Sequence, residues 1–193
     1  LEAVLGRREV GEVWRPSPPH ETPASVRVAE LVRELGVPWR HAPVGERLVL
    51  DDLVIEVLGP KRRYASPNDQ SVVLRVTGPG GARLLLTGDV ERHAQADLAG
   101  VRAEVLKVPH QGAATSDLEW LASVGARLAV VSVGPNDYGH PAPEVIAALE
   151  SAGAVVHRTD HAGDAVIDLA ADVDDLAPHA ETPRHLPRGV DGG

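Results

Sequence analysis

Four short polar segments carry side chains suited to acid–base or metal chemistry. They are Asn68-Asp69-Gln70-Ser71, Thr87-Gly88-Asp89, His110-Gln111-Gly112 and Asn136-Asp137-Tyr138-Gly139-His140-Pro141. Carboxylate and imidazole groups ligate divalent metal ions, and an imidazole also acts as a general acid or base near neutral pH. The chain has no Cys, so thiolate nucleophiles and Cys-type zinc sites are excluded, which leaves His, Asp and Glu as candidate metal ligands.

Each segment also has a structural interpretation that the residues alone leave open. Asp89 stands where a helix over 90–98 would begin, and spacing alone favours a helix N-cap over a functional role by roughly two to one. A single His after a buried strand, such as His110, is more often hydrogen-bonded structure than a ligand. His140 precedes a proline and would close a turn, and the first segment would supply turn and strand-cap residues.

Apolar periodicity predicts the elements that position these segments. Strands are predicted over 9–14, 47–50, 53–58, 71–77, 83–87, 104–108, 128–133, 154–157 and 163–169, and helices over 25–35, 90–98, 117–124 and 143–152. Asp51-Asp52 and Gly78-Pro79-Gly80-Gly81 are predicted to be hairpin turns. Ser116, with Glu119 three residues later, indicates a capping box. Hairpins followed by alternating strands and helices predict an α/β layered domain.

Composition limits the range of partners. The 193 residues carry a net charge of −9, but eight acids and two Arg lie after residue 159, which leaves 20 acids against 17 bases before it. Such a body lacks the broad basic surface of a nucleic-acid clamp, so a phosphate substrate would have to be held locally, for instance by metal ions. No run approaches the roughly 20 apolar residues of a membrane span. The chain begins with Leu1 and has no Met, which suggests a piece of a longer product.

The order of the motifs resembles that of one known family. The sequence contains, in order, Asn68-x-x-Ser71, Leu85-Leu86-Thr87-Gly88-Asp89, Leu106-Lys107-Val108-Pro109-His110-Gln111-Gly112 with Ser116, Ser132-x-Gly134-x-Asn136-x-Tyr138-Gly139-His140-Pro141, and Arg158-Thr159-Asp160-x-x-Gly163. This series resembles the metallo-β-lactamase-like domain at the C-terminus of the ComEC/Rec2 competence proteins, over about residues 45–169.

The resemblance implies an αββα sandwich, here mainly its C-terminal half, with two divalent metal ions (Mn or Zn) at one edge. Residues 1–169 would form a partial domain, and 170–193 an acidic, Pro/His/Arg-containing disordered tail. The family's first ligand cluster, of the HxHxDH kind, is absent from this sequence and is expected to lie upstream.

Site roles follow from the same resemblance. Asp89 matches the carboxylate that bridges the two metals, and His110 matches a downstream imidazole ligand. The site-lining positions correspond to Asn68, Ser71, Ser116 and His140, the last a candidate proton donor to the leaving oxygen. The chain departs from the family at Gln111, where a second His is usual, and at Ala113, where Ser is common.

The implied function is DNA internalization during transformation. The complete domain would cleave phosphodiester bonds of the DNA strand that is not transported, with metal ions holding the single strand and activating water. It would be a soluble domain joined to a membrane channel, on the extracytoplasmic face of the cell membrane, and this piece alone would be inactive. Two alternatives remain open: a stand-alone hydrolase of a small ester or nucleotide with the same fold, and a non-catalytic structural or DNA-positioning domain.

Overall fold

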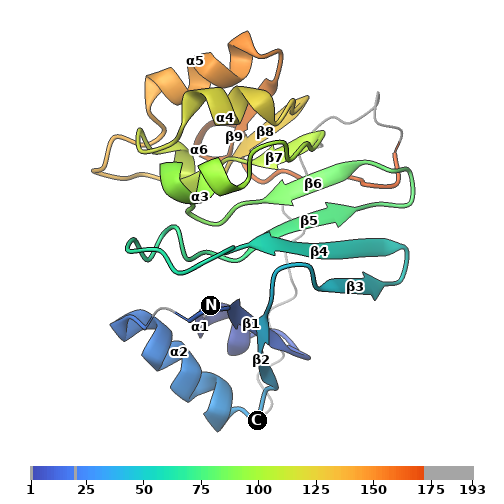
Figure 1. Ribbon diagram of the computed structural model, residues 1–193, viewed down its shortest axis with the longest axis vertical. Helices are drawn as coiled ribbons and strands as arrows, with labels where there is room; N and C mark the ends of the chain where they lie inside the picture. The colour runs from blue at the N-terminus through green and yellow to red at the C-terminus, as the bar shows by residue number, and fades with distance from the viewer. Residues whose placement is uncertain (1, 20, 172–193) are drawn as a thin grey trace, which may run out of the picture.

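The main element of the fold is a mixed seven-stranded sheet. The computed structural model describes residues 2–19 and 21–171. In sheet order, the strands are β3 (Arg47–Leu50), β4 (Leu53–Gly59), β5 (Val73–Thr77), β6 (Arg83–Leu86), β7 (Val105–Lys107), β8 (Leu128–Val131) and β9 (Val155–Arg158). Pairing is antiparallel from β3 to β6 and parallel from β6 to β9. The sheet therefore changes type at β6 (Figure 1).

The two predicted hairpins are confirmed, because their turn residues adopt the backbone conformations that tight turns require. Asp51 has φ 49° between β3 and β4, and Gly81 has φ 84° between β5 and β6. Positive φ at such positions matches the right-handed twist of the paired strands.

Helices pack over the parallel end of the sheet (Figure 1). They are α3 (Arg92–Asp97), α4 (Leu118–Ser123), α5 (Pro143–Ser151) and the short α6 (Thr159–Ala162), with a 3-10 turn η1 (Pro109–Gly112) after β7. Leu85 and Leu106 pair across β6 and β7, and both belong to a buried cluster that also holds Leu121 and Leu149 of the helices. Complete burial of one such Leu side chain contributes about 1.5–3 kcal/mol.

A smaller unit precedes the main sheet. It consists of α1 (Glu2–Leu5), β1 (Val13–Pro16), α2 (Pro23–Glu34) and β2 (Trp39–Ala42), and β1 pairs with β2 in parallel. Leu5, Val13 and Val32 form its own buried cluster. The predicted helix over 25–35 begins two residues earlier, because Thr22 and Ser25 form a reciprocal capping box.

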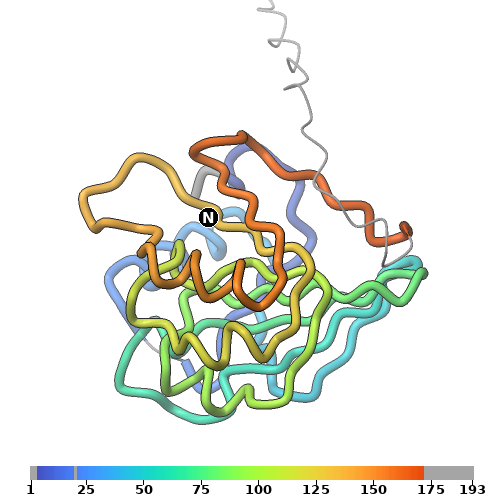
Figure 2. Tube along the Cα trace, turned by 90° about the horizontal axis from the view of Figure 1, so that it is seen from above, coloured from blue at the N-terminus to red at the C-terminus, as the bar shows by residue number. Residues whose placement is uncertain are grey.

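The strand predicted over 9–14 lies instead at Val13–Pro16. Two further local predictions are wrong. The segment over 163–169 has one bridging residue, Val166, rather than a strand. It runs back to the turn between β5 and β6, where a side chain at Gly78 would collide with the Leu169 backbone (red in Figure 2). The second concerns α4, whose N-cap is Asp117 instead of Ser116: the Asp117 side chain accepts a hydrogen bond from the Trp120 N–H (2.9 Å).

The α/β class is confirmed by the mixed sheet and its helical layer, in agreement with an αββα sandwich represented mainly by its C-terminal half. Of the expected tail over 170–193, all but residues 170 and 171 lies outside the described residues. Among the helices that the structure describes, none has the length and apolar character that crossing a membrane requires.

Candidate active site

The polar segments meet at one edge of the sheet. Since β6, β7 and β8 are parallel, the loops after their carboxyl ends lie side by side. Leu74 near the start of β5 pairs with Leu86 at the end of β6, which brings residues 68–71 to the same edge. Loops at the carboxyl ends of parallel strands are the usual location of sites in such sheets.

Asp89 is held by close contact between two loops. Its backbone N–H donates to Ser71 Oγ (3.0 Å). Gly88 has φ 57°, and a Cβ there would lie 2.6 Å from Ser71 Cβ, so only glycine permits this approach. The Asp89 side chain is 52% exposed, and its nearest recorded ionic partner is Lys107 Nζ at 3.9 Å. The backbone of Asp89 is therefore fixed while its carboxylate remains accessible.

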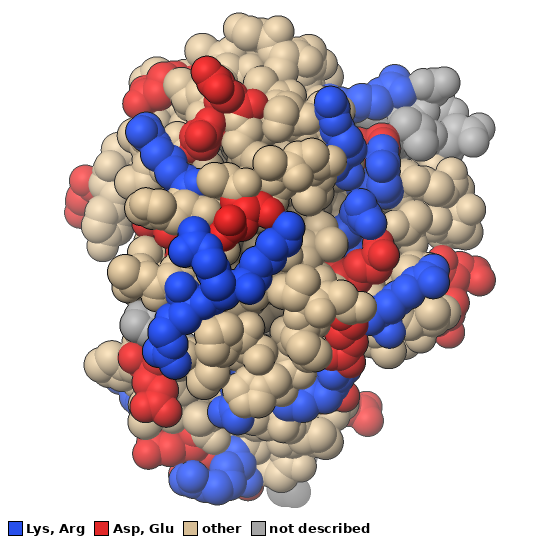
Figure 3. Space-filling view, viewed as in Figure 1, with Lys and Arg blue, Asp and Glu red and all other residues tan. Residues whose placement is uncertain are grey.

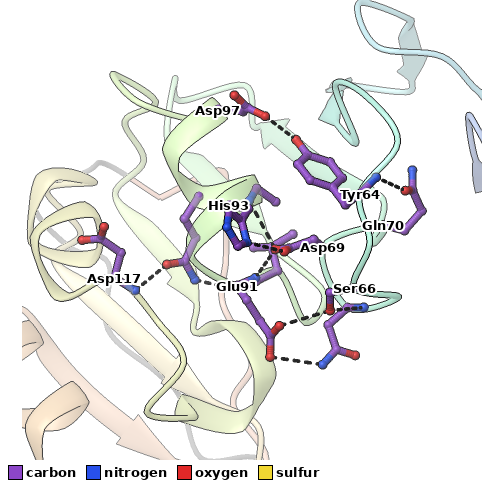
Figure 4. A network of polar contacts seen from close by, with 12 residues as sticks. Tyr64, Ser66, Asp69, Gln70, Glu91, His93, Asp97 and Asp117 are labelled. Carbon is purple, nitrogen blue, oxygen red and sulfur yellow. Dashed lines mark hydrogen bonds and ion pairs between the residues drawn. The ribbon is translucent and has the colours of Figure 1, made fainter.

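The helix-cap interpretation of Asp89 is wrong, because another carboxylate does that work. The N-cap of α3 is Glu91, whose side chain makes no capping bond. Asp69 Oδ1 instead accepts from the backbone N–H of Glu91 (2.7 Å) and of Ala94 (3.2 Å), and Asp69 is only 1% exposed. Figure 4 shows Asp69 reaching the helix start from the loop between β4 and β5. The fold thus leaves the Asp89 side chain free of a capping role.

Lys107 makes hydrogen bonds to the loop after β6 that carries Asp89. Its Nζ donates to the Gly88 carbonyl (2.9 Å), and the Thr87 hydroxyl donates to the Lys107 carbonyl (2.7 Å). Burial lowers the pKa of Lys107, and the nearby Asp89 carboxylate opposes that shift.

His110 lies in a strained turn. Both His110 (φ 45°) and Gln111 (φ 55°) adopt left-handed backbone conformations, which cost about 1–3 kcal/mol each for residues other than glycine. The His110 N–H donates to the Gly88 carbonyl (3.2 Å). A Cβ at Gly112 would lie 2.6 Å from Pro141 Cβ, so the turn packs tightly against the loop after β8. Strain of this kind concentrates at functional sites.

Glu91 connects His110 to the loop before β5. Glu91 Oε1 lies 3.5 Å from His110 Nδ1, a buried atom without a recorded hydrogen bond. The same carboxylate accepts from Asn68 Nδ2 (3.3 Å) and Ser66 Oγ (3.1 Å) (Figure 4). Burial alone would raise the pKa of Glu91, but hydrogen bonds from Asn68, Ser66 and Thr115, with His110 nearby, hold it below its usual value. Glu91 is therefore an anion facing His110 Nδ1.

His140 lies beside His110. Their ring centroids are 5.5 Å apart in an edge-to-face arrangement. Asn136 fixes the backbone of His140 by accepting from its N–H (3.1 Å) and donating to its carbonyl (2.9 Å). The two imidazoles come from separate loops and meet only in the folded chain.

Ser116 lies apart from these contacts. It is 1% exposed and its hydroxyl is 3.5 Å from Gln95 Nε2, which also donates to the Val90 carbonyl (2.8 Å). Ala113 is buried and Gln111 is partly exposed. The structure thus connects Asn68, Ser71, Asp89, His110 and His140 through shared contacts, and leaves Ser116 within the packing between α3 and α4.

Asp89 and His110 suit metal ligation individually. With Nδ1 facing a carboxylate, His110 offers Nε2 to a ligand, and this carboxylate–histidine pairing is common around protein-bound metals. The described residues nevertheless hold no group of three or more His, Asp or Glu side chains that could bind a metal ion.

Sequence reasoning missed Glu91 and Asp69. Glu91 lies two residues after Asp89, within the helix predicted over 90–98, and Asp69 lies in a segment predicted to form a turn. The sequence carries no signal for the Asp69 bonds, which join residues more than 20 positions apart.

Charges of both signs surround this region. A surface pocket next to Glu91 is lined by Arg62, Arg63 and His93 but also by Asp69. On the face shown in Figure 3, Lys and Arg side chains lie among Asp and Glu. On this face the charges of both signs are interspersed (Figure 3).

Two competence proteins are similar to the chain. It is 31% identical over 169 residues to ComE operon protein 3 of Bacillus subtilis (strain 168), covering 84% of this chain and 22% of that protein. It is 35% identical over 126 residues to competence protein ComA of Neisseria gonorrhoeae, covering 61% of this chain and 18% of that protein. The chain therefore spans about a fifth of the length of these relatives. No established family profile matches it.

Among solved structures, a Thermotoga maritima protein described as a Zn-dependent hydrolase of the metallo-β-lactamase superfamily is similar at 16% identity. The match covers 66% of this chain and 61% of that one, with a TM-score of 0.36.

Proposed function

Because this chain belongs to the ComEC/Rec2 family of competence proteins, we propose that it is the metallo-β-lactamase-like domain of that family and serves in DNA uptake as part of a longer protein. In this proposal the complete domain cleaves phosphodiester bonds of the strand that is not transported, on the extracytoplasmic face of a membrane channel. The observation that carries the proposal is the similarity to two competence proteins over most of this chain.

The site geometry supports a hydrolytic role. The Asp89 carboxylate does not cap α3, and His110 adopts a strained left-handed backbone conformation. Glu91 Oε1 lies 3.5 Å from His110 Nδ1, so that nitrogen faces a carboxylate and Nε2 is the nitrogen left to contact a ligand. His140, beside His110, is proposed to donate a proton to the leaving oxygen.

The metal ions of this proposal need ligands beyond Asp89 and His110, since the described residues hold no complete ligand group. We expect those ligands in an HxHxDH cluster upstream of Leu1, with Mn or Zn as the ion. The 193-residue chain alone should then cleave DNA little or not at all.

The test compares the complete domain with its Asp89→Ala variant. We expect stoichiometric Mn or Zn in the wild type, metal-dependent cleavage of single-stranded DNA, and at least a hundredfold loss in the variant. Glu150→Ala, in an exposed position on α5, is the matched control and should keep full activity. Absence of bound metal, or unchanged cleavage in Asp89→Ala, would refute the two-metal hydrolase. Hydrolysis of small esters but not DNA would instead identify another substrate class.

A further inference from the structure

Tyr138 is a large aromatic residue that the described fold does not bury. Aromatic side chains are scarce in this chain, which has three Trp, two Tyr and no Phe. Tyr138 is 82% exposed, whereas Tyr64 is 6% and Trp120 is 5% exposed. The core therefore gains almost nothing from Tyr138, although a chain so poor in aromatic residues would be expected to bury them.

The loop that carries Tyr138 is nevertheless well organised. Asn136 Oδ1 accepts from the backbone N–H of both Tyr138 and His140 (3.1 Å each). Asn136 Nδ2 donates to the carbonyls of Gly134 (3.0 Å) and His140 (2.9 Å). This loop, between β8 and α5, projects from the body of the protein in Figures 1 and 2. One amide side chain thus fixes an outward loop whose tip carries an aromatic ring.

Tyr138 is the outermost of three adjoining rings. Its ring lies nearly parallel to that of His140, with 22° between the planes and 5.9 Å between centroids. His140 in turn meets His110 edge to face at 5.5 Å. The series runs from solvent at Tyr138 to the partly buried His110 of the candidate active site. Ring pairs at these separations have the geometry of favourable aromatic contacts.

From this arrangement we infer that Tyr138 and His140 form a stacking platform for a nucleobase of single-stranded DNA. The inference rests on the proposed DNA substrate and adds the binding site for its bases. Every base has a π face, so stacking holds a strand without regard to sequence and contributes about 1–3 kcal/mol per base. It also needs no broad basic surface, which suits the mixed charges of the face in Figure 3.

Position explains how such a platform would serve cleavage. A base stacked on Tyr138 lies at the end of a ring series that reaches His110, so the sugar-phosphate chain attached to it is held near the candidate active site. Duplex DNA keeps its bases stacked on one another and offers the platform no free face. The site would therefore favour the single strand.

The 193-residue chain permits a direct test because it has only two tyrosines. With ¹³C-labelled tyrosine rings, NMR should show two sets of ring signals, and Tyr64, buried and bonded through its hydroxyl to Asp97 (2.7 Å), is an internal reference. We expect a short oligodeoxyadenylate to shift the Tyr138 signals upfield and to leave those of Tyr64 unchanged. An abasic oligomer of the same length, with the same phosphates, should not shift them.

Fluorescence anisotropy measures the affinity of the wild type and of variants for the same oligonucleotide. Tyr138→Ala should weaken oligonucleotide binding about fivefold to a hundredfold, and Tyr138→Trp should preserve it. Val155→Ala removes another exposed apolar side chain, 64% exposed on β9, and should change nothing. Tyr138 signals that stay fixed, an equal response to the abasic oligomer, or unchanged affinity in Tyr138→Ala would each overturn the platform.

Failure of the platform and failure of the proposed function give different results. If bases stack on Tyr138 but the complete domain does not cleave DNA, the proposed nuclease activity is refuted and the stacking site is supported. Cleavage that depends on Asp89, combined with binding that ignores Tyr138, would keep the nuclease and refute the platform.

Discussion

Replacing Asp69 by Ala should destabilise the protein much more than replacing Asp89 by Ala. Asp69 is 1% exposed and accepts two backbone N–H groups at the start of α3. Loss of a helix cap costs about 0.5–2 kcal/mol, and each buried donor left without an acceptor costs about 1–3 kcal/mol. With partial rescue by water, Asp69→Ala should lower the free energy of unfolding by about 2–4 kcal/mol. Asp89 has only a half-exposed ion pair to lose, worth about 0–1 kcal/mol.

Urea unfolding followed by tryptophan fluorescence and by circular dichroism measures both variants. Trp120 is a suitable probe, since it is buried and its indole N–H donates to the Leu98 carbonyl just after α3 (3.4 Å). Asp69→Asn is an informative intermediate, because the amide oxygen keeps an acceptor for the two N–H groups. Its loss of stability should be smaller than that of Asp69→Ala.

Two outcomes would refute this reasoning. If Asp89→Ala costs as much as Asp69→Ala, then Asp89 has the structural role that spacing alone favoured. If Asp69→Ala lowers the free energy of unfolding by less than about 0.5 kcal/mol, water replaces the hydrogen bonds that Asp69 accepts at the start of α3.

The pKa of Glu91 is held below its usual value in the folded chain, so its contribution to stability is present above the ordinary Glu pKa of about 4.3 and is lost as pH falls through the folded value. Glu91→Gln should lower the free energy of unfolding at neutral pH, and this free energy should then fall less steeply as the pH is lowered. A fall as steep as that of the wild type would contradict this prediction. Gly112→Ala should cost more than Gly81→Ala when unfolding free energies are compared. Both glycines have positive φ, which costs a residue with a Cβ about 1–2 kcal/mol of strain. Only at Gly112 would the added Cβ also collide with Pro141. Equal losses of stability would show that the turn after β7 and the loop after β8 separate easily.

Much of the fold could be predicted because its elements have local signals. The turn between β5 and β6 is specified by Gly78-Pro79-Gly80-Gly81, and the apolar runs on either side pair in the expected antiparallel register. The segment over 163–169 also has a strand-like composition, yet it packs against a distant turn. A short segment at the end of a sheet is decided by its tertiary contacts, which composition does not reveal.

The candidate site was only partly predictable. The sequence singled out Asp89, His110 and His140, since each follows a predicted strand. It could not distinguish a capping Asp from a free one, because that depends on Asp69, which lies 20 positions away in the chain. It could not reveal Glu91 as the partner of His110, because the contacts of that carboxylate with His110, Asn68 and Ser66 exist only after folding.

The change from antiparallel to parallel pairing at β6 also bears on the order in which the chain folds. Strands β3 and β4 are joined by two residues (51–52) and β5 and β6 by five (78–82), so contacts within each hairpin are local in sequence and close with a small loss of entropy, whereas 13 residues (60–72) connect the two hairpins. Strands β7 to β9 each require a crossover through a helix, and proteins rich in such non-local contacts fold more slowly. Ser71 directly precedes the second hairpin and His110 follows the first parallel strand after it, β7. The site therefore forms only when the hairpins and the crossovers have both folded, and we expect the hairpins to form first.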